Sequence, residues 1–258
     1  MVLCIIQARM GSTRLPGKVM EKIDHERTVL DYVISQVKFS NKVEEVIVAT
    51  TNLIEDDIIC QHLDLQKNKF FRGSSEDVLD RFYQCAKKES AKNIVRITAD
   101  NPLIDPNIID TVINENENNK CDCTTNTINR TFPYGTEVEI FSFESLEKAW
   151  KNAKKPSERE HVTPFIYNPK NKFILNSIEN EKNISYLRYT VDKIEDLLLV
   201  KEIVKNISTR PILLQDIINL QREKPEIFEI NKNVKHDGYL SSIKKDEQYF
   251  KSKNNESS

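Results

Sequence analysis

A loop rich in cations, hydroxyl groups and glycines follows the first apolar segment of the chain. It reads QARMGSTRLPGK over residues 7–18 and carries Arg9, Arg14 and Lys18. Glycines let backbone N–H groups approach phosphate oxygens, an arginine offers forked hydrogen bonds, and a lysine offers a movable point charge. The loop therefore predicts a polyphosphate site, with a basic surface loop containing turn glycines as the alternative.

The candidate phosphate-binding residues of this loop are Gln7, Ala8, Arg9, Gly11, Ser12, Arg14 and Lys18. Their spacing matches neither GxxxxGK[ST] nor GxGxxG, which disfavours a P-loop kinase and a Rossmann dehydrogenase. Because we interpret the loop as exposed, we expect Lys18→Ala to weaken nucleotide binding without changing the melting temperature.

Two aspartates, Asp100 and Asp192, each end an apolar, strand-like segment. The dipeptide that follows Asp100 contains Pro102 and turns the chain, so we expect Asp100 at the same sheet edge as the loop. A Mg²⁺ ion needs only one or two carboxylates beside phosphate oxygens and water. Each acid has an alternative role as a cap, Asp100 for the turn or helix that follows it and Asp192 for a helix that starts near Ile194.

Four further charged or titratable side chains lie within or beside apolar sequence. Arg96 interrupts an apolar strand, where an unpaired cation is costly, so we expect it to face an acid or a phosphate. Glu137 and Glu139 alternate as one face of a strand does, and point either into a substrate pocket or into solvent. His161 is either a general base or a structural or dimer-contact residue.

The order of apolar patterns predicts the scaffold that positions these residues. Short apolar runs alternate with amphipathic stretches, which indicates βαβ units and a mostly parallel sheet flanked by helices. The predicted strands span residues 2–8, 44–51, 92–100, 136–143 and 183–192. The predicted helices span residues 28–40, 55–65, 75–89, 143–153 and 195–207, with the helix at 75–89 starting at Ser75.

Composition limits the classes of protein that the chain can be. With 258 residues and 38% hydrophobic residues it can bury a large core, and we expect one domain over 1–230 and a polar, partly disordered tail over 231–258. A net charge of −2 gives no overall basic field, which argues against nucleic-acid binding. No apolar stretch is long enough to span a membrane, and we expect a cytoplasmic protein.

The five cysteines contain no CxxC pair, so we expect reduced thiols and no zinc site. We interpret Cys121 and Cys123 as structural residues, because no partner ligands follow them in the sequence.

Six motifs in order carry a family resemblance over about residues 1–230. They are STRLPGK (12–18), RGSSEDVLDRF (72–82), RITADNPLID (96–105), RTFPYGTEVEIF (130–141), EREHVTPFIY (158–167) and LRYTVDKIEDLLLV (187–200). The chain resembles the cytidylyltransferases that activate sugar acids, such as the CMP-3-deoxy-octulosonate and CMP-sialic acid synthetases. It is most similar to the SpsF group of spore coat polysaccharide biosynthesis proteins.

This resemblance implies a Rossmann-like fold and transfer of CMP from CTP to a small acidic acceptor (a sugar acid, phosphonate or phosphate), with release of pyrophosphate. Asp100 and Asp192 match the family's acids for Mg²⁺, and Arg9 and Lys18 complete the implied catalytic set. Gly73, Ser74 and Asp77, with Arg81, fall in a stretch that the family places near the nucleotide or the acceptor; by sequence alone, Asp77 or Arg81 could equally form a surface ion pair. The alternatives are a glycosyltransferase of the GT-A type and a non-catalytic nucleotide-binding protein of the same pathway.

The region over 131–182 breaks the βαβ rhythm, and we predict that it forms a small β-rich lobe that pairs two chains as a homodimer. The resembling synthetases dimerise through an equivalent insertion. Its aromatic residues Phe132, Tyr134, Phe165 and Tyr167 would otherwise be exposed, unless they pack back on the parent domain.

Overall fold

One seven-stranded sheet runs through the computed structural model, which describes residues 1–235 and Asp246. The strand order is β3-β2-β1-β4-β6-β5-β7. The strands are β1 (Val2–Gln7), β2 (Glu45–Thr51), β3 (Phe70–Gly73), β4 (Asn93–Thr98), β5 (Cys123–Thr125), β6 (Glu139–Ser142) and β7 (Leu175–Ser177). Strands β1 to β4 are mutually parallel, and β6 runs antiparallel to both of its neighbours, β4 and β5.

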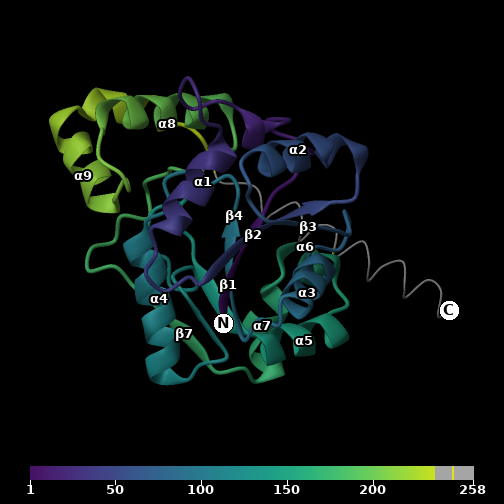
Figure 1. Cartoon of the computed structure of the whole chain (residues 1–258). Coiled ribbons are helices and arrows are strands. Elements are labelled where there is room, and N and C mark those ends of the chain that lie inside the picture. The colour runs from purple at the N-terminus through teal and green to yellow at the C-terminus, as the bar shows by residue number, and fades with distance from the viewer. Residues whose placement is uncertain (236–245, 247–258) are drawn as a thin grey trace.

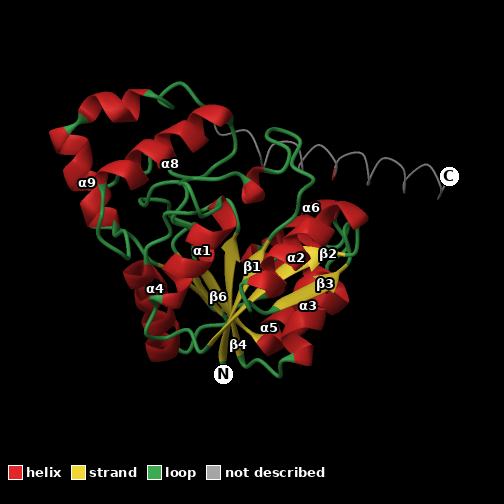
Figure 2. Ribbon diagram, turned by 45° about the horizontal axis from the view of Figure 1, so that its top comes forward, coloured by secondary structure: helices red, strands yellow, loops and turns green. Residues whose placement is uncertain are grey.

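Helices cover both faces of this sheet (Figures 1 and 2). The α-helices are α1 (Val29–Lys38), α2 (Asp57–Leu65), α3 (Val78–Lys88), α4 (Pro106–Asn119), α5 (Phe143–Asn152), α6 (Pro156–His161), α7 (Pro164–Tyr167), α8 (Ile194–Asn206) and α9 (Leu214–Glu223). Short 3₁₀ helices are η1 (Lys18–Met20), η2 (Ile54–Asp56), η3 (Pro169–Asn171) and η4 (Pro225–Glu229).

The apolar side chains of β1 alternate between two buried cores. Cys4 and Ile6 pack in the core that α1, α2, α4, α8 and α9 share, whereas Leu3 and Ile5 pack in the core of α3, α5 and α7. A strand buried on both faces needs apolar residues at every position, which is why residues 2–6 form a continuous apolar run.

The parallel register places two loops of the site next to each other. Gln7 pairs with Thr98 at the carboxyl ends of β1 and β4. Just beyond them, the Ala99 N–H donates to the Gln7 carbonyl at 3.0 Å and the Ala8 N–H donates to the Ala49 carbonyl at 3.1 Å. Ligands of open α/β sheets bind at this edge, so the cation-rich loop and Asp100 start from the place where a site is expected.

The structure confirms the α/β class and the strands predicted at 2–8, 44–51 and 92–100. The helices predicted at 28–40, 55–65, 75–89, 143–153 and 195–207 are present with small shifts at their ends. Of the strand predicted at 136–143, only Glu139–Ser142 is a strand.

The strand predicted at 183–192 is wrong. Its backbone bonds to loops instead of to a neighbouring strand: the Tyr189 N–H donates to the Tyr134 carbonyl at 2.7 Å and the Val191 N–H donates to the Asp100 carbonyl at 2.8 Å. Tyr189 and Val191 are nevertheless buried, so the alternating apolar pattern reports their burial and not a sheet ladder.

The β-rich lobe predicted at 131–182 does not form as a separate unit. Strands β6 and β7 belong to the main sheet, and α5, α6 and α7 lie between them in the chain. Phe132 and Phe165 pack into the two cores of the parent domain. The homodimer therefore stays a prediction and loses the support that exposed aromatic residues would give.

The folded part extends beyond the predicted boundary at residue 230. Asn231 is buried, and its Nδ2 donates to the Arg188 carbonyl at 3.1 Å and to Asp196 Oδ1 at 2.9 Å. Most of the predicted disordered tail, residues 236–245 and 247–258, lies outside the described residues.

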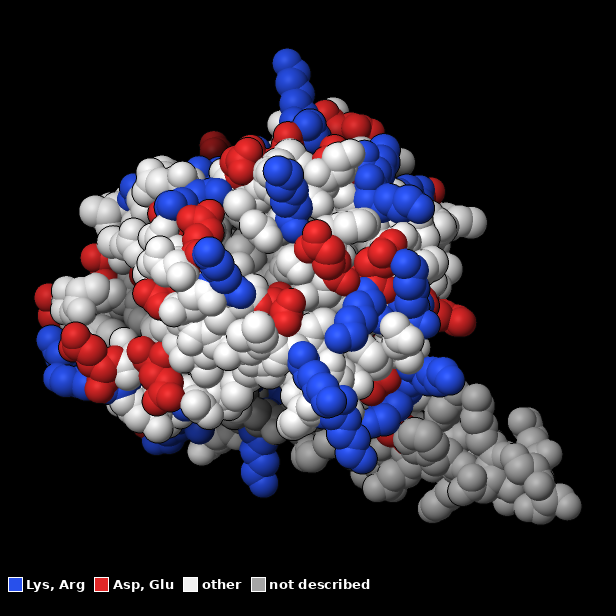
Figure 3. Space-filling view, turned by 90° about the horizontal axis from the view of Figure 1, so that it is seen from below, with Lys and Arg blue, Asp and Glu red and all other residues white. Residues whose placement is uncertain are grey.

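No helix among the described residues is both long and apolar enough to cross a membrane. All five cysteines are free thiols, as expected, and Cys123 is buried in β5. On the face shown in Figure 3, basic and acidic side chains are interspersed.

Candidate functional site

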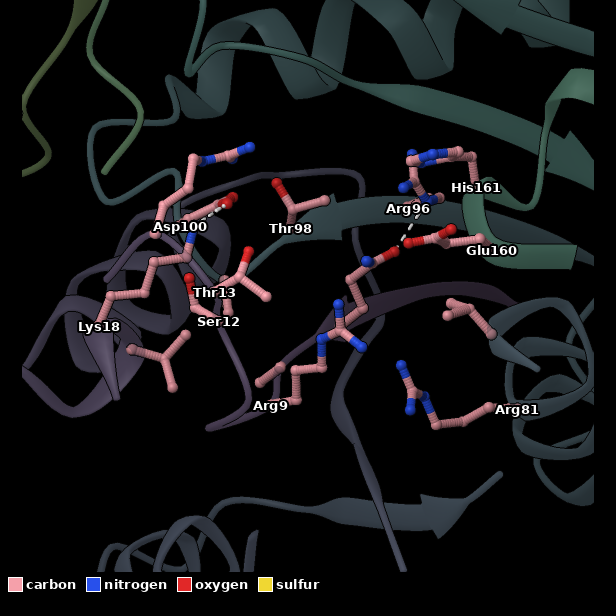
Figure 4. A pocket seen from close by; sticks show the side chains of 16 residues that line it. Arg9, Ser12, Thr13, Lys18, Arg81, Arg96, Thr98, Asp100, Glu160 and His161 are labelled. Carbon is pink, nitrogen blue, oxygen red and sulfur yellow. Dashed lines mark hydrogen bonds and ion pairs between the residues drawn. The ribbon is translucent and has the colours of Figure 1, made fainter. Parts of the chain in front are cut away.

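A cavity of about 310 Å³ opens at the carboxyl ends of β1 and β4 (Figure 4). The predicted residues that line it are Gln7, Ala8, Arg9, Ser12, Arg14, Lys18, Arg96 and Asp100. A second cavity of about 690 Å³ adjoins it. The two cavities share Arg96, Thr98, Asp100 and His161 as wall residues, so a ligand in one can contact a ligand in the other.

The loop after β1 is held in a compact turn by its own backbone. The carbonyl of Met10 accepts hydrogen bonds from the N–H groups of Ser12 at 2.7 Å and Gly17 at 3.0 Å. Gly17 has φ of 72°, a left-handed conformation that favours glycine, and η1 starts directly after it with Lys18. The turn thus directs Lys18 back towards the sheet edge.

Lys18 is the residue that links the predicted site together. Its Nζ donates to Asp100 Oδ2 at 2.6 Å and to Asp192 Oδ1 at 2.7 Å. The expectation of an exposed Lys18 is wrong, since its side chain is only 10% exposed. Burial acts to lower the pKa of Lys18, but Asp100 and Asp192 outweigh it and raise that pKa.

Asp192 is the most heavily paired acid of the site. Besides Lys18, it accepts hydrogen bonds from Arg14 Nη2 at 2.5 Å and from Arg188 Nη2 at 2.9 Å. Burial acts to raise the pKa of Asp192, but Lys18 and Arg14 hold it well below its usual range. The two predicted acids, which are far apart in the sequence, therefore both pair with the ammonium group of Lys18.

The alternative roles of these acids as caps belong to other residues. Asp196 accepts the N–H groups of Asp192 and Lys193, each at 3.0 Å, at the start of α8. Asp105 caps α4 by accepting the Asn107 N–H at 2.7 Å. Asp100 and Asp192 therefore do not serve as the caps of these helices.

Arg96 faces an acid, as predicted. Its Nη1 donates to Glu139 and its Nε donates to Gln7 at 3.0 Å. Glu139 is buried and also accepts hydrogen bonds from the hydroxyl groups of Thr163, at 2.7 Å, and Tyr167. Glu139 therefore organises the wall of the second cavity and does not point into solvent.

Glu137 has a similar role in the second cavity. It accepts hydrogen bonds from Arg130 Nη1 at 2.7 Å, from the Gly135 N–H at 2.8 Å and from Asn101 Nδ2 at 3.2 Å. His161, at the end of α6, lines both cavities.

Four predicted site residues are not among those that line either cavity: Gly11, Gly73, Ser74 and Asp77. Asp77 instead caps α3 by accepting the Asp80 N–H at 2.8 Å, and it pairs with Arg159 Nε at 2.8 Å. The Ser74 carbonyl accepts a hydrogen bond from Arg81 Nη1 at 2.9 Å. Ser74 and Asp77 thus stabilise the start of α3 and its contact with α6.

Arg81 lines a cavity, which favours a place near the nucleotide or acceptor over the alternative of a surface ion pair. It is 1% exposed, it lines the first cavity, and its Nε has no hydrogen-bond partner. Burial and the nearby Arg9 lower the pKa of Arg81 to about 10. A Cβ atom at Gly73 would lie 2.9 Å from Arg81 Cγ, so this glycine leaves room for the arginine. The sequence signal was its position on the apolar stripe of α3, three residues after Val78 and one before Phe82.

Comparison with known proteins gives one consistent family. Residues 3–244 match the family model described as Cytidylyltransferase. The chain is 38% identical over 240 residues to the uncharacterised protein MJ1063 of Methanocaldococcus jannaschii, covering 92% of this chain and 97% of that protein. It is 31% identical over 233 residues to the spore coat polysaccharide biosynthesis protein SpsF of Bacillus subtilis, covering 87% and 95%. A solved structure of a cytidylyltransferase from Leptospira borgpetersenii has a TM-score of 0.85 and 34% identity, covering 91% and 99%.

Proposed function

Because the chain belongs to the cytidylyltransferase family and is a nucleotidyltransferase, we propose that it transfers CMP from CTP to a small acidic acceptor and releases pyrophosphate. The observation that carries this proposal is the convergence of Lys18 and Arg14 on the Asp100 and Asp192 pair, where the two cavities meet. Cations for a triphosphate and carboxylates for a metal ion thus lie at one point of the sheet edge.

The triphosphate lies in the first cavity, with Arg9, Ser12, Arg14 and Lys18 as its partners. Lys18 and Asp100 lie at one end of this cavity and Arg81 at the other (Figure 4). Arg81, whose Nε has no partner, then lies at the nucleoside end, where the carbonyl and ring nitrogen of cytosine are hydrogen-bond acceptors. Filling that donor offsets the cost of burying an unsatisfied guanidinium.

Asp100 and Asp192 fit the needs of a Mg²⁺ ion that is bound together with phosphates. No cluster of three or more His, Cys, Asp or Glu side chains within 1–235 and Asp246 could hold a metal ion on its own. The two acids nevertheless approach close enough to share one cation, the Lys18 ammonium. When bound, the ion would neutralise charge on the phosphate oxygens during the transfer, with phosphate and water completing its ligands.

The acceptor occupies the second cavity and attacks the α-phosphorus from the side of Asp100 and His161. A new bond forms between the acceptor oxygen and the α-phosphorus, and the bond from that phosphorus to the pyrophosphate oxygen breaks. The proton of a hydroxyl acceptor passes to His161, which borders both cavities. Positioning and charge neutralisation by the loop cations supply most of the rate.

Arg130 selects the acidic group of the acceptor, a carboxylate, phosphonate or phosphate. It is the most exposed of the three arginines that line this cavity, with a side-chain exposure of 23% against 13% for Arg96 and 7% for Arg188. Its guanidinium lies 4.0 Å from the ring centroid of Tyr134, which fixes its orientation. The relation to SpsF supports a role in surface polysaccharide synthesis.

Pyrophosphate release tests the proposal. The purified protein is incubated with Mg²⁺ and CTP, UTP, GTP or ATP against a panel of sugar acids, phosphates and phosphonates. We expect release only with CTP and one acceptor class, and none from Asp100→Asn. Nucleoside diphosphate formed from a nucleotide sugar would instead indicate a glycosyltransferase, and nucleotide binding without turnover across the panel would indicate a non-catalytic protein.

A further inference from the structure

The ammonium group of Lys18 lies between Asp100 and Asp192, the two carboxylates proposed to bind the metal ion. Its Nζ is 2.6 Å from Asp100 Oδ2 and 2.7 Å from Asp192 Oδ1, and all three side chains are largely buried. The ammonium group thus occupies the position between the two carboxylates that a metal ion shared by them would take. The ammonium must therefore leave before the ion can bind.

We propose that Lys18 is an internal counter-ion that holds Asp100 and Asp192 together in the nucleotide-free protein and moves to the triphosphate when CTP binds. The divalent cation and the nucleotide then bind as a unit, because the two acids become free for the ion only when the triphosphate has drawn Lys18 away. This inference rests on the proposed function and specifies the order in which that site fills.

The charges of the cluster support this exchange. Lys18, Arg14 and Arg188 face Asp100, Asp192 and Asp196, so three cations balance three carboxylates. A divalent cation added to this neutral, poorly solvated cluster would be repelled by the cations that already contact Asp192. A triphosphate in the adjoining cavity adds negative charge and removes that obstacle.

The structure also provides a path for the exchange. Lys18 and Arg14 both line the first cavity, and Arg14 has a side-chain exposure of 35%. The four-carbon stem of a lysine lets its ammonium move while the backbone of η1 stays in place. Arg188 remains on Asp196, to which its Nε and Nη2 donate at 2.9 and 3.0 Å, and keeps Asp192 oriented after Lys18 leaves.

The test measures Mn²⁺ binding to the nucleotide-free protein by electron paramagnetic resonance of the free ion. Lys18→Gln keeps a long polar side chain but removes the charge. We expect it to bind one Mn²⁺ at least tenfold more tightly than the wild type. Lys22→Gln is the matched control, since it removes a charge from an exposed lysine of the same segment that bonds only to the His25 carbonyl among the contacts described, and it should bind like the wild type. Adding Asp192→Asn to Lys18→Gln should abolish the gain.

Arg14→Gln gives a second variant if Lys18→Gln does not fold, and we expect a smaller gain in Mn²⁺ affinity from it. Equal affinity of the wild type and of the folded charge-removal variant would overturn the proposal, as would a gain that survives Asp192→Asn. Because no nucleotide is present, the outcome is separate from CMP transfer. If the variant gains Mn²⁺ affinity but the wild type releases no pyrophosphate from CTP, the counter-ion proposal stands and the proposed CMP transfer is refuted. If the wild type releases pyrophosphate but the variant gains no Mn²⁺ affinity, CMP transfer stands and the counter-ion proposal is refuted.

Discussion

The buried charges of the site differ in how they are compensated. Lys18, Asp192 and Arg96 each have a partner of opposite charge within hydrogen-bond distance. Arg81 has only a backbone carbonyl for Nη1 and no partner for Nε. Four buried side-chain atoms of the described chain are unpartnered, and Arg81 Nε is the one among them whose residue borders a cavity. This unpartnered donor supports the proposed role of Arg81 in nucleotide binding.

Arg81→Met should separate binding from stability. The change removes a guanidinium that burial destabilises, so we expect an unchanged or higher melting temperature. We expect CTP affinity, measured by isothermal titration calorimetry, to fall at least tenfold, which is about 1.4 kcal/mol. Arg159→Met is the control: it breaks the ion pair with Asp77 and should lower stability by about 1 kcal/mol. A fall in melting temperature for Arg81→Met without a change in affinity would assign this residue to the fold instead.

Asp100→Asn and Asp192→Asn should each reduce CTP turnover at limiting Mg²⁺ at least 100-fold, because one neutral ligand leaves the metal ion under-coordinated. Asp192→Asn should also cost more stability, since Asp192 pairs with three cations and Asp100 with one. Turnover and urea unfolding measure the two effects. Full activity of Asp192→Asn would exclude it as a metal ligand.

The stability cost of Asp192→Asn should depend on pH. The pKa of Asp192 is lowered in the folded protein, so its contribution is present above the ordinary aspartate pKa of about 4 and is lost as pH falls below it. The difference in free energy of unfolding between the wild type and the variant should therefore shrink below about pH 4. A difference that stays constant from pH 7 to pH 3 would show that the Asp192 charge does not stabilise the fold.

At the scale of elements, a buried carboxylate anchors the proposed phosphate-binding loop to the connection between β2 and α2. Asp56, the last residue of η2, is fully buried. Its Oδ1 accepts the Met10 N–H at 2.7 Å, and its Oδ2 accepts hydrogen bonds from the N–H and hydroxyl groups of Thr51. Through Asp56, the first turn of the loop that follows β1 is therefore linked to the end of β2.

Asp56→Ala should lower the free energy of unfolding by about 2–3 kcal/mol, because hydrogen bonds to a buried charged group are lost. It should also raise the KM for CTP, since Met10 starts the turn that presents Ser12 and Lys18. Asp57→Ala provides the comparison: Asp57 pairs with Arg72 at the surface, and its loss should cost less than 1 kcal/mol. If Asp56→Ala leaves KM unchanged, the loop does not need this anchor.

The elements also show what the sequence can and cannot predict. Strong periodicity predicts β1, β2 and β4 and the helices α1, α2, α3, α5 and α8, and the glycines and cations after the first strand predict a polyphosphate site. It does not predict α4, the longest described helix, or α9 and β3. The segment 183–192 has the same alternation, but its partners are the loop residues Tyr134 and Asp100, and no local pattern records a contact across that distance. Likewise, no local pattern shows that Asp100 and Asp192 lie close together, and only the family resemblance assigns both acids to one metal site.

At the scale of the whole molecule, the candidate site consists of two adjoining cavities at one edge of the mixed sheet. Parallel β1 and β4 bring the phosphate loop and Asp100 together, while antiparallel β6 carries Glu139 into the adjoining wall. Helix α3 adds Arg81 from the opposite face of the sheet to α1 and α8. One segment, residues 7–19, supplies many of the residues that line the first cavity, whereas the second is lined by segments spread from Arg96 to Asp192, so a short motif predicts the first cavity better than the second.

We predict that the protein is a homodimer, by similarity to the synthetases that it resembles. In the sheet, β7 is an edge strand of three residues, and the chain has a mass of 30.0 kDa. Multi-angle light scattering at micromolar concentration should give twice the chain mass. A mass of one chain under these conditions would refute the dimer without affecting the assignment of the cavities.

The fate of the phosphates of CTP tests the central claim most directly. The protein, Mg²⁺ and the acceptor identified by screening are incubated with CTP labelled with ³²P at either the α or the γ position. We predict that the α label moves into the acceptor product and that the γ label leaves as pyrophosphate. With Asp100→Asn, neither label should leave CTP. Transfer of the γ label to the acceptor, or release of both labels by hydrolysis without an acceptor product, would contradict CMP transfer.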